Sequence, residues 1–281
     1  MAALAARRRA SGVRFHLEAF SRRDALCERA LRMGADTAGP PPAAGGGPRA
    51  DVVVDTTGSP DGLALALALA RRAVHVKSTH GRPSGGLSET TALVVDELEI
   101  ARLPRGDDAV TGAIRDRAIS APPRRPPRAT RAAAEVVRDR RAAVLLERLA
   151  PRADRLPRAD VAVVDAAAQI DDVIRPVAGR EVSLVRPRGL ILLHPEARTD
   201  PARDPLAHAV ASRGLGVAGS RCGDFREALA LLEADAALRD ALSGLVTHRL
   251  PAARLAEAMR LARSPEAIKV VIEHPGDPDA A

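Results

Sequence analysis

The sequence is poor in aromatic residues and in lysine. It has no Trp, no Tyr and three Phe, and its only lysines are Lys77 and Lys269. Proteins that bind single-stranded nucleic acid stack bases on several aromatic rings, and this chain has too few aromatic residues to form such a surface. The formal net charge of +7 comes almost wholly from Arg spread along the chain with Ala and Pro. We therefore interpret the charge as compositional bias and expect no nucleic-acid partner.

Cysteine is also scarce, and no set of metal ligands stands out. Cys27 and Cys222 are the only cysteines, which excludes a disulfide framework and a four-cysteine zinc site. The seven His form no His-x-x-x-His or His-Glu pair. The sequence therefore predicts no metal site, and it predicts that Cys222 is a small packing residue.

Long apolar runs are missing as well. No run reaches the ~18 residues that a membrane helix needs. Arg7, Arg8 and Arg9 near the amino terminus are not followed by the apolar stretch of a secretory signal. Since 46% of the residues are apolar, there is enough material for a buried core. We expect a soluble cytoplasmic protein with no membrane partner.

The clearest pattern that is present runs from Asp51 to Thr79. Residues 51–55 (DVVVD) form a β-branched apolar run, typical of a strand buried on both faces of a parallel sheet. A turn with Gly, Ser and Pro leads into a helix rich in Leu and Ala, and residues 73–76 predict a second strand. Parallel strands joined by a helix bind ligands at their carboxyl ends, so we expect a nucleotide-type crevice near Thr57 and Lys77.

Further elements are expected on both sides of this unit. Residues 39–48 and 102–131 are rich in Pro, Gly or Arg, and predict a flexible loop and a polyproline-like connector. A second strand-helix-strand pattern covers residues 160–194, either as an internal repeat or by convergence. Residues 87–100 predict a short helix or loop and an apolar run. The other expected helices are 1–12, 24–33, 132–149, 223–234 and 252–262, and the other expected strands are 13–20, 215–218, 245–250 and 268–272.

Two separated blocks resemble the cofactor-binding half of the medium-chain dehydrogenase/reductases, the zinc-type alcohol dehydrogenase superfamily. The first is residues 51–79, similar to that family's strand-TGSP-helix-strand unit, followed by LVVDEL at 93–98. The second starts with GSRCGDF at 219–225 and continues through THRLP at 247–251 to ARSPEAIKVVI, which ends at Ile272. Together with residues 13–36, the resemblance covers a little over half of the chain.

The sequence also departs from this family. It has no counterpart of the zinc-binding Cys and Gly-His-Glu motifs, nor of the first nucleotide strand with its G-x-G-x-x-G turn. Residues 101–214 stand where the family has a short link, and this insert would either add strands to the main sheet or form a satellite. We expect the chain to be either a fragment of a longer gene product or a divergent member.

The fold class implied by the resemblance is α/β. It is a Rossmann-like doubly wound parallel sheet, incomplete at its N-terminal edge and carrying an α/β insert. Residues 1–100 would form a partial dinucleotide-binding domain, residues 101–214 the insert, and residues 215–281 the rest of the dinucleotide-binding domain.

The resemblance also implies cofactor-binding residues at strand ends. Ser21, Arg22 and Arg23 stand where the family distinguishes its nicotinamide cofactors, and a small residue followed by Arg favours NADP over NAD. The alternative interpretation of these residues is a pair of Arg side chains exposed to solvent, with no role in binding. Thr57 and Gly58 would pass close to the cofactor, although a simple helix-capping turn has the same composition.

The remaining candidates follow later strands. Lys77, Ser78 and Thr79 would face the nicotinamide ribose, where a lysine is otherwise a solvated strand-end charge. Ser220 and Arg221 would border the nicotinamide pocket. Lys269 matches the family's basic residue that reaches the pyrophosphate, although a strand-flanking lysine is an equal explanation.

The resulting hypothesis is an oxidoreductase-family protein that binds NADP, or else NAD, for hydride transfer on an alcohol or carbonyl substrate. No zinc is expected in this chain and no catalytic residue can be named, which argues against turnover by this chain alone. The alternative is a non-catalytic Rossmann-like binding or interaction module that docks through residues 102–131. A nucleic-acid-associated protein is a third reading, and formation of a homo-oligomer stays open.

Overall fold

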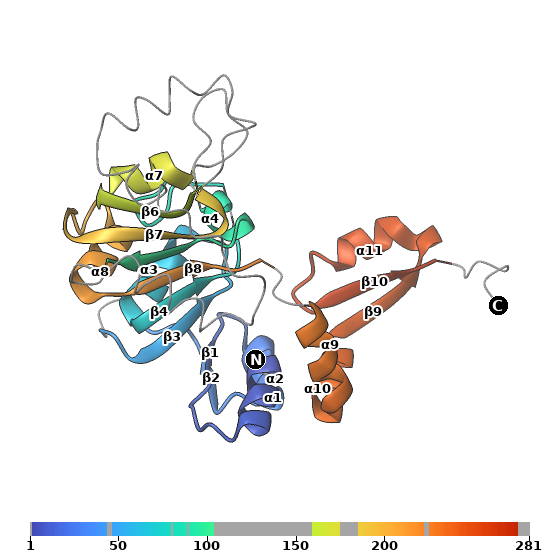
Figure 1. Cartoon of the computed structure of the whole chain (residues 1–281). Coiled ribbons are helices and arrows are strands. Elements are labelled where there is room, and N and C mark those ends of the chain that lie inside the picture. Colours follow the sequence, from blue (N-terminus) through green and yellow to red (C-terminus); the bar gives the residue numbers. More distant parts are fainter. Residues whose placement is uncertain are drawn as a thin grey trace. The chain divides into compact units, whose positions relative to one another are not determined.

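The computed structural model describes residues 2–43, 47–79, 81–88, 90–103, 159–174, 185–221 and 225–274 (Figure 1). Contacts divide the chain into two compact units. The larger is Ala43–Gly223, and the smaller combines Met1–Pro42 with Asp224–Ala281. These two units are defined by contacts within the structure. The three domains predicted from the sequence, residues 1–100, 101–214 and 215–281, rest on the family resemblance and stay a prediction.

The larger unit has an α/β fold around a six-stranded, mostly parallel sheet with strand order β3-β4-β8-β5-β7-β6 (Figure 1). Strands β3, β4 and β8 run parallel to one another, and so do β5, β7 and β6. The two sets meet at the antiparallel pair β5–β8. The carboxyl ends of the two sets therefore lie at opposite ends of the sheet. The strands are β3 (Ala50–Asp55), β4 (Ala70–Val76), β5 (Glu99–Arg102), β6 (Ala159–Ala166), β7 (Val185–Arg198) and β8 (Gly216–Gly219).

The expected strand-helix-strand unit is confirmed. Helix α3 (Pro60–Leu69) connects β3 to β4, which pair in parallel. It begins where the Ser59 hydroxyl accepts a hydrogen bond from the Gly62 amide at 3.1 Å, with Pro60 in the first turn. Both features favour a helix start, because proline needs no amide partner there and the hydroxyl satisfies a free N–H. The helix then buries Leu63, Ala66, Leu67 and Leu69.

The insert contributes strands to this same sheet. Strands β6 and β7, both from residues 101–214, pair in parallel with each other, and β7 also pairs with β5. Of the two arrangements that the sequence left open, the structure thus has the one in which the insert extends the sheet. Leu190, Leu192 and Val161 form a small second apolar cluster on these strands.

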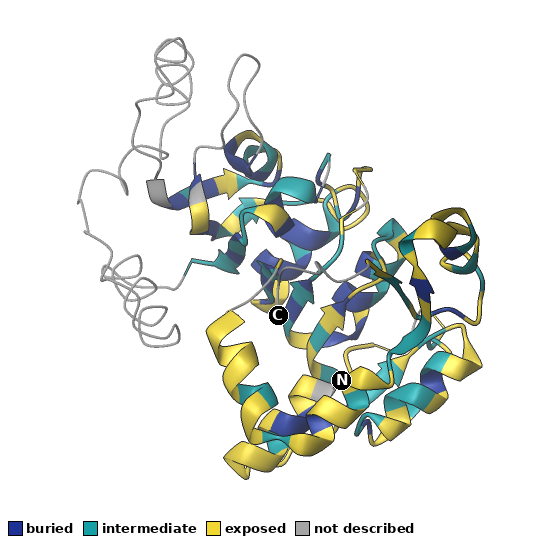
Figure 2. Ribbon diagram, turned by 90° about the vertical axis from the view of Figure 1, so that its right-hand side faces the viewer, coloured by how far each residue is buried: buried dark blue, intermediate teal, exposed yellow. Residues whose placement is uncertain are grey.

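The main core unites alternate residues of the strands with α3, α4 (Thr91–Val95), α7 (Ala168–Ile174) and α8 (Pro205–Arg213). Buried residues follow the strands and the inward sides of the helices (Figure 2). Helix α8 was not expected, although Pro205 at its start and Gly214, in a left-handed conformation at its end, are typical helix signals. The largest fully buried side chains of this core include Leu63, Leu93, Leu98, Ile100, Ile170, Ile174, Ile191, Leu193, Leu206 and Leu215.

The prediction that residues 51–55 are buried on both faces is wrong. Strand β3 ends the strand order, and Val52 and Val54 are 52% and 45% exposed. Only Val53, on the other face, packs against the main core. A continuous apolar run is compatible with a central strand or an edge strand, so the run by itself did not determine the position of the strand in the sheet.

The smaller unit contains two short parallel strand pairs. Strands β1 (Glu18–Phe20) and β2 (Thr37–Gly39) form one pair, and β9 (Val246–Pro251) and β10 (Lys269–Glu273) the other. Its helices are α1 (Ala2–Ser11), α2 (Asp24–Arg32), α9 (Phe225–Ala234), α10 (Ala236–Ser243), the 3-10 turn η2 (Ala252–Arg254) and α11 (Leu255–Leu261). Strand β2 and helix α10 were not expected. The strand expected at residues 13–20 is limited to β1, and Val13 and Phe15 before it are exposed.

Two carboxylates of the smaller unit hold α1 in place. Asp36 accepts hydrogen bonds from the Leu17 amide at 2.7 Å and the Arg8 guanidinium at 2.6 Å, and these contacts lower the pKa of the carboxyl. The pKa of Asp235 is lowered by the Arg9 guanidinium and then by the Leu238 amide. In both carboxyl groups the hydrogen-bond donors stabilise the negative charge and so favour the ionised form.

No helix among the described residues is long and apolar enough to cross a membrane. Several sequence-based expectations lie outside the described residues. They concern the connector from residue 104 onward, the helix at 132–149 and the packing role of Cys222.

Candidate functional site

The carboxyl ends of β3, β4 and β8 bring together seven of the predicted cofactor-binding residues. These are Thr57 and Gly58 after β3, Lys77, Ser78 and Thr79 after β4, and Ser220 and Arg221 after β8. The ladder continues past the last strand residues, because the Lys77 amide donates to the Asp55 carbonyl at 2.8 Å and the Ser220 amide to the Val76 carbonyl at 3.0 Å. Thr57 and Lys77 thus follow neighbouring strands, and the expected nucleotide-type crevice beside them stays a prediction.

The Lys77 ammonium bridges the ends of β4 and β8. It donates to the Ser220 hydroxyl and to the Arg221 carbonyl, each at 3.2 Å, and its side chain is half-buried. Both partners are neutral oxygens, and within the described part of the chain no carboxylate forms an ion pair with Lys77. An ammonium group has three donors, so one N–H remains for another acceptor.

A carboxylate that the sequence did not single out supports this turn. Glu97 accepts the Arg221 amide at 3.2 Å on one oxygen and the Arg188 guanidinium at 2.8 Å on the other. Glu97 and Arg188 also have left-handed backbone conformations, with φ of 51° and 65°. Such conformations are uncommon for residues other than glycine and occur often at functional sites. Glu97 thus links an arginine of the insert to the turn that contacts Lys77.

The turn after β3 is stabilised by its own side chains. The buried Asp55 carboxylate accepts the Thr57 amide at 2.9 Å and the Thr57 hydroxyl at 2.7 Å. A side chain at Gly62 would collide with Thr57, because a Cβ there would lie 1.8 Å from the Thr57 hydroxyl oxygen. These contacts give the Thr57 hydroxyl a structural role within the helix-capping turn.

Gly58 allows two strand ends to approach each other. It has a left-handed conformation with φ of 61°, and a Cβ would lie 3.3 Å from the Ser78 Cβ. The Ser78 hydroxyl donates to the Thr56 carbonyl at 3.2 Å across the same contact. Glycine is favoured here for its conformation and for the close approach to Ser78. The expected approach of this backbone to a cofactor stays a prediction.

The other four predicted residues, Ser21, Arg22, Arg23 and Lys269, lie in the smaller unit. The Arg23 amide donates to the Ser21 hydroxyl at 3.1 Å. The pKa of Glu266 is lowered mainly by a hydrogen bond from its own amide, and further by the positive charge of the Arg23 guanidinium. Arg23 therefore lies within electrostatic range of the turn that precedes Lys269. That all the predicted residues share one crevice stays a prediction.

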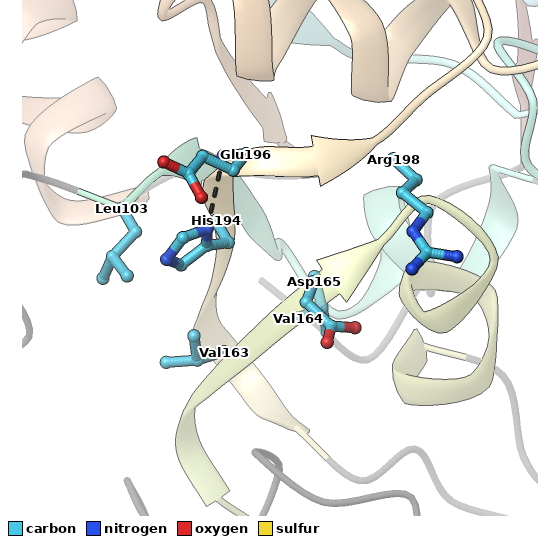
Figure 3. A pocket seen from close by; sticks show the side chains of 7 residues that line it. All are labelled: Leu103, Val163, Val164, Asp165, His194, Glu196 and Arg198. Carbon is cyan, nitrogen blue, oxygen red and sulfur yellow. Dashed lines mark hydrogen bonds between the residues drawn. The ribbon is translucent and has the colours of Figure 1, made fainter.

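A pocket of about 340 Å³ lies at the opposite end of the sheet, where β5, β6 and β7 have their carboxyl ends (Figure 3). It is lined by Leu103, Val163, Val164, Asp165, His194, Glu196 and Arg198. Sequence analysis did not select these residues. A pattern in the sequence that could have pointed to them is the alternation of polar residues after an apolar run. These polar residues are His194, Glu196 and Arg198.

Among the residues that the structure describes, no cluster of His, Cys, Asp or Glu is arranged to hold a metal ion. Comparisons with protein-family models, with curated proteins and with solved structures found no match to this chain.

Proposed function

We propose that this chain binds a nicotinamide dinucleotide, NADP in preference to NAD, at the carboxyl ends of β3, β4 and β8, as an oxidoreductase-family protein. The observation that carries the proposal is the Lys77 ammonium, which is half-buried and, among the residues that the structure describes, contacts neutral oxygens of Ser220 and Arg221 and no carboxylate. A charged group withdrawn from water is stabilised by an opposite charge. The phosphates of a dinucleotide supply that charge.

The position of Lys77 also supports this ligand class. Ligands of open α/β sheets bind beyond the carboxyl ends of the parallel strands, and Lys77 directly follows β4 between β3 and β8. The parallel β3-α3-β4 connection and the mostly parallel sheet are compatible with the Rossmann-like arrangement, which we include in the proposal.

In the proposed reaction the cofactor carries the hydride to or from an alcohol or carbonyl substrate. The protein supplies binding, orientation and electrostatics. The preference for NADP over NAD is carried over only from the family resemblance of Ser21, Arg22 and Arg23, a small residue followed by two Arg.

The proposal is tested by titrating the full chain with NADPH and NADH while recording nicotinamide fluorescence. The protein has no Trp or Tyr, so the emission of the cofactor is recorded against little protein background. We expect a saturable change, with tighter binding of NADPH. Absence of saturable binding of either cofactor would contradict the proposal. Binding without turnover of simple alcohols or aldehydes would instead favour the non-catalytic binding module.

Replacement of Glu97 by Gln tests whether the Arg188–Glu97 pair positions the Lys77 turn. Gln keeps an acceptor for the Arg221 amide but removes the charge that holds Arg188. We expect NADPH binding to weaken by roughly three- to tenfold, the range for loss of one hydrogen-bond partner. Isothermal titration calorimetry measures the effect.

A double-mutant cycle supplies the control for this prediction. If the pair acts as a unit, Glu97→Gln combined with Arg188→Gln weakens binding no more than either single change. Fully additive effects of the two changes would show that Arg188 does not act through Glu97.

A further inference from the structure

Lys77 and Ser220 are adjacent residues at the ends of two neighbouring parallel strands. The last pair of the β4–β8 ladder is Val76 with Gly219, so Lys77 and Ser220 come next on each strand. The Ser220 amide donates to the Val76 carbonyl at 3.0 Å, which continues the ladder by one residue. On the other side of β4, the Lys77 amide donates to the Asp55 carbonyl at 2.8 Å. Both side chains therefore start from backbone that the sheet holds in place.

The hydrogen bond between these two side chains has only one possible direction. An ammonium group has three donors and no acceptor, so Lys77 Nζ donates and the Ser220 hydroxyl oxygen accepts, at 3.2 Å. The proton of the Ser220 hydroxyl is not used in this bond. Among the residues that the structure describes, none accepts that proton. Ser220 is therefore able to donate a hydrogen bond to a ligand.

Lys77 has one donor left as well. Its second N–H reaches the Arg221 carbonyl at 3.2 Å, and its third has no acceptor in the described part of the chain. One N–H and one O–H, on atoms 3.2 Å apart, are thus free at the same point of the sheet end. A hydroxyl proton rotates to suit its acceptor, so both donors can bind the same anionic group.

The charges around this pair favour an anion. Neither Lys77 nor the exposed Arg221 forms an ion pair with a described residue. The carboxylate that supports the same turn is Glu97, which accepts the Arg221 amide at 3.2 Å and the Arg188 guanidinium at 2.8 Å. The charge of Glu97 is therefore paired with Arg188, and Lys77 keeps its own charge for a ligand.

We propose that the Lys77 ammonium and the Ser220 hydroxyl together bind one phosphate group, in preference to a carboxylate. A phosphate has three acceptor oxygens and up to two negative charges, whereas a carboxylate has two oxygens and one charge. The phosphate belongs to the cofactor or to a phosphorylated second ligand. The inference rests on the site of the proposed function, but it requires no nicotinamide.

The test is calorimetric titration of the full chain with pyrophosphate and with orthophosphate, and with acetate as the control anion. We expect saturable binding of pyrophosphate and orthophosphate, and binding of acetate at least about tenfold weaker than either. Ser220→Ala removes only the hydroxyl. It should weaken pyrophosphate binding about tenfold or more, the range for a hydrogen bond to a charged group.

Ser212→Ala is the matched control in the same unit. The Ser212 hydroxyl already donates to the His208 carbonyl on α8, so its loss should leave pyrophosphate binding unchanged. Circular dichroism establishes that both variants are folded. The inference is overturned if neither phosphate compound binds, if acetate binds as tightly as orthophosphate, or if Ser220→Ala binds pyrophosphate like Ser212→Ala.

Competition with NADPH identifies the source of the phosphate. If the group belongs to the cofactor, pyrophosphate displaces NADPH, and Ser220→Ala loses affinity for both. If it belongs to a second ligand, pyrophosphate binds equally well to the chain saturated with NADPH. Pyrophosphate binding that depends on Ser220, in a chain that does not bind NADPH, would support this inference and contradict the proposed function. NADPH binding without any pyrophosphate binding would do the reverse.

Discussion

Gly219→Ala is expected to destabilise the larger unit by at least about 2 kcal/mol. Gly219 ends β8, directly before Ser220, and the backbone of α4 packs against it. A Cβ at this position would lie 1.9 Å from the Leu93 carbonyl oxygen and 2.9 Å from the Val94 Cα. Both contacts are with backbone atoms, so the collision cannot be relieved by rotating a side chain, and β8 or α4 must move.

Gly216→Ala is the matched control on the same strand. The nearest atom to a Cβ at Gly216 is the Arg72 carbonyl oxygen at 3.7 Å, an ordinary contact. This change should be neutral or slightly stabilising, by less than about 1 kcal/mol, because alanine restricts the unfolded chain. Urea denaturation followed by circular dichroism measures both variants. Equal midpoints for the two would show that α4 does not pack on Gly219 as described.

Lys77→Met should weaken NADPH binding by about ten- to one-hundredfold. Met retains the length and apolar character of the side chain but removes the ammonium group at the ends of β4 and β8. A hydrogen bond between a charged donor and a phosphate contributes about 1.5–3 kcal/mol, which corresponds to this range. Fluorescence titration measures the dissociation constant directly.

The control for Lys77 is Arg72→Met, which removes an exposed positive charge from the same strand without altering its carboxyl end. NADPH binding should then change less than about twofold, because the charge is solvated and distant from the strand end. Salt sensitivity gives a second measurement. If Lys77 contacts a phosphate, raising the ionic strength weakens NADPH binding to the unmodified chain more than to Lys77→Met. Equal losses in the Lys77 and Arg72 variants would indicate only a general charge effect.

Local chemistry in the sequence was sufficient for the strand-helix-strand unit and its turns. Gly58 and the Ser59 cap identified the start of α3, because left-handed backbone and hydroxyl capping depend on a few neighbouring residues. The proximity of Thr57 and Lys77 also followed from the order of the elements, since parallel strands place their carboxyl ends together. Ser220 was placed near them only by the family resemblance, and the pairing of β4 with β8 was decided by the tertiary structure. The nicotinamide assignment of those residues remains a proposal that the titrations test.

Burial illustrates what the order of residues leaves undetermined. Residues 51–55 and 160–165 are similar apolar runs, DVVVD and DVAVVD, and both form edge strands. Val52 and Val54 are exposed, whereas Val161 and Val164 are 5% and 1% exposed. The difference arises from neighbours that are distant in the sequence, since Val161 packs with Leu190 and Leu192 of β7.

The sequence by itself determined the α/β class, the β3-α3-β4 unit and the capped turns, because these depend on interactions between residues close in the chain. Only the tertiary structure decided that the insert enters the main sheet, that β5 and β8 pair antiparallel, and that a bulge of β7 between Leu193 and Arg198 opens a pocket with Asp165 and His194. It also decided the contact of Glu97 with Arg188 and with the Arg221 amide. The bulge depends on the pairing of β6 with β7, about 30 residues apart, and the other features on contacts between segments about 90 or more residues apart, for which local propensity and periodicity contain no information.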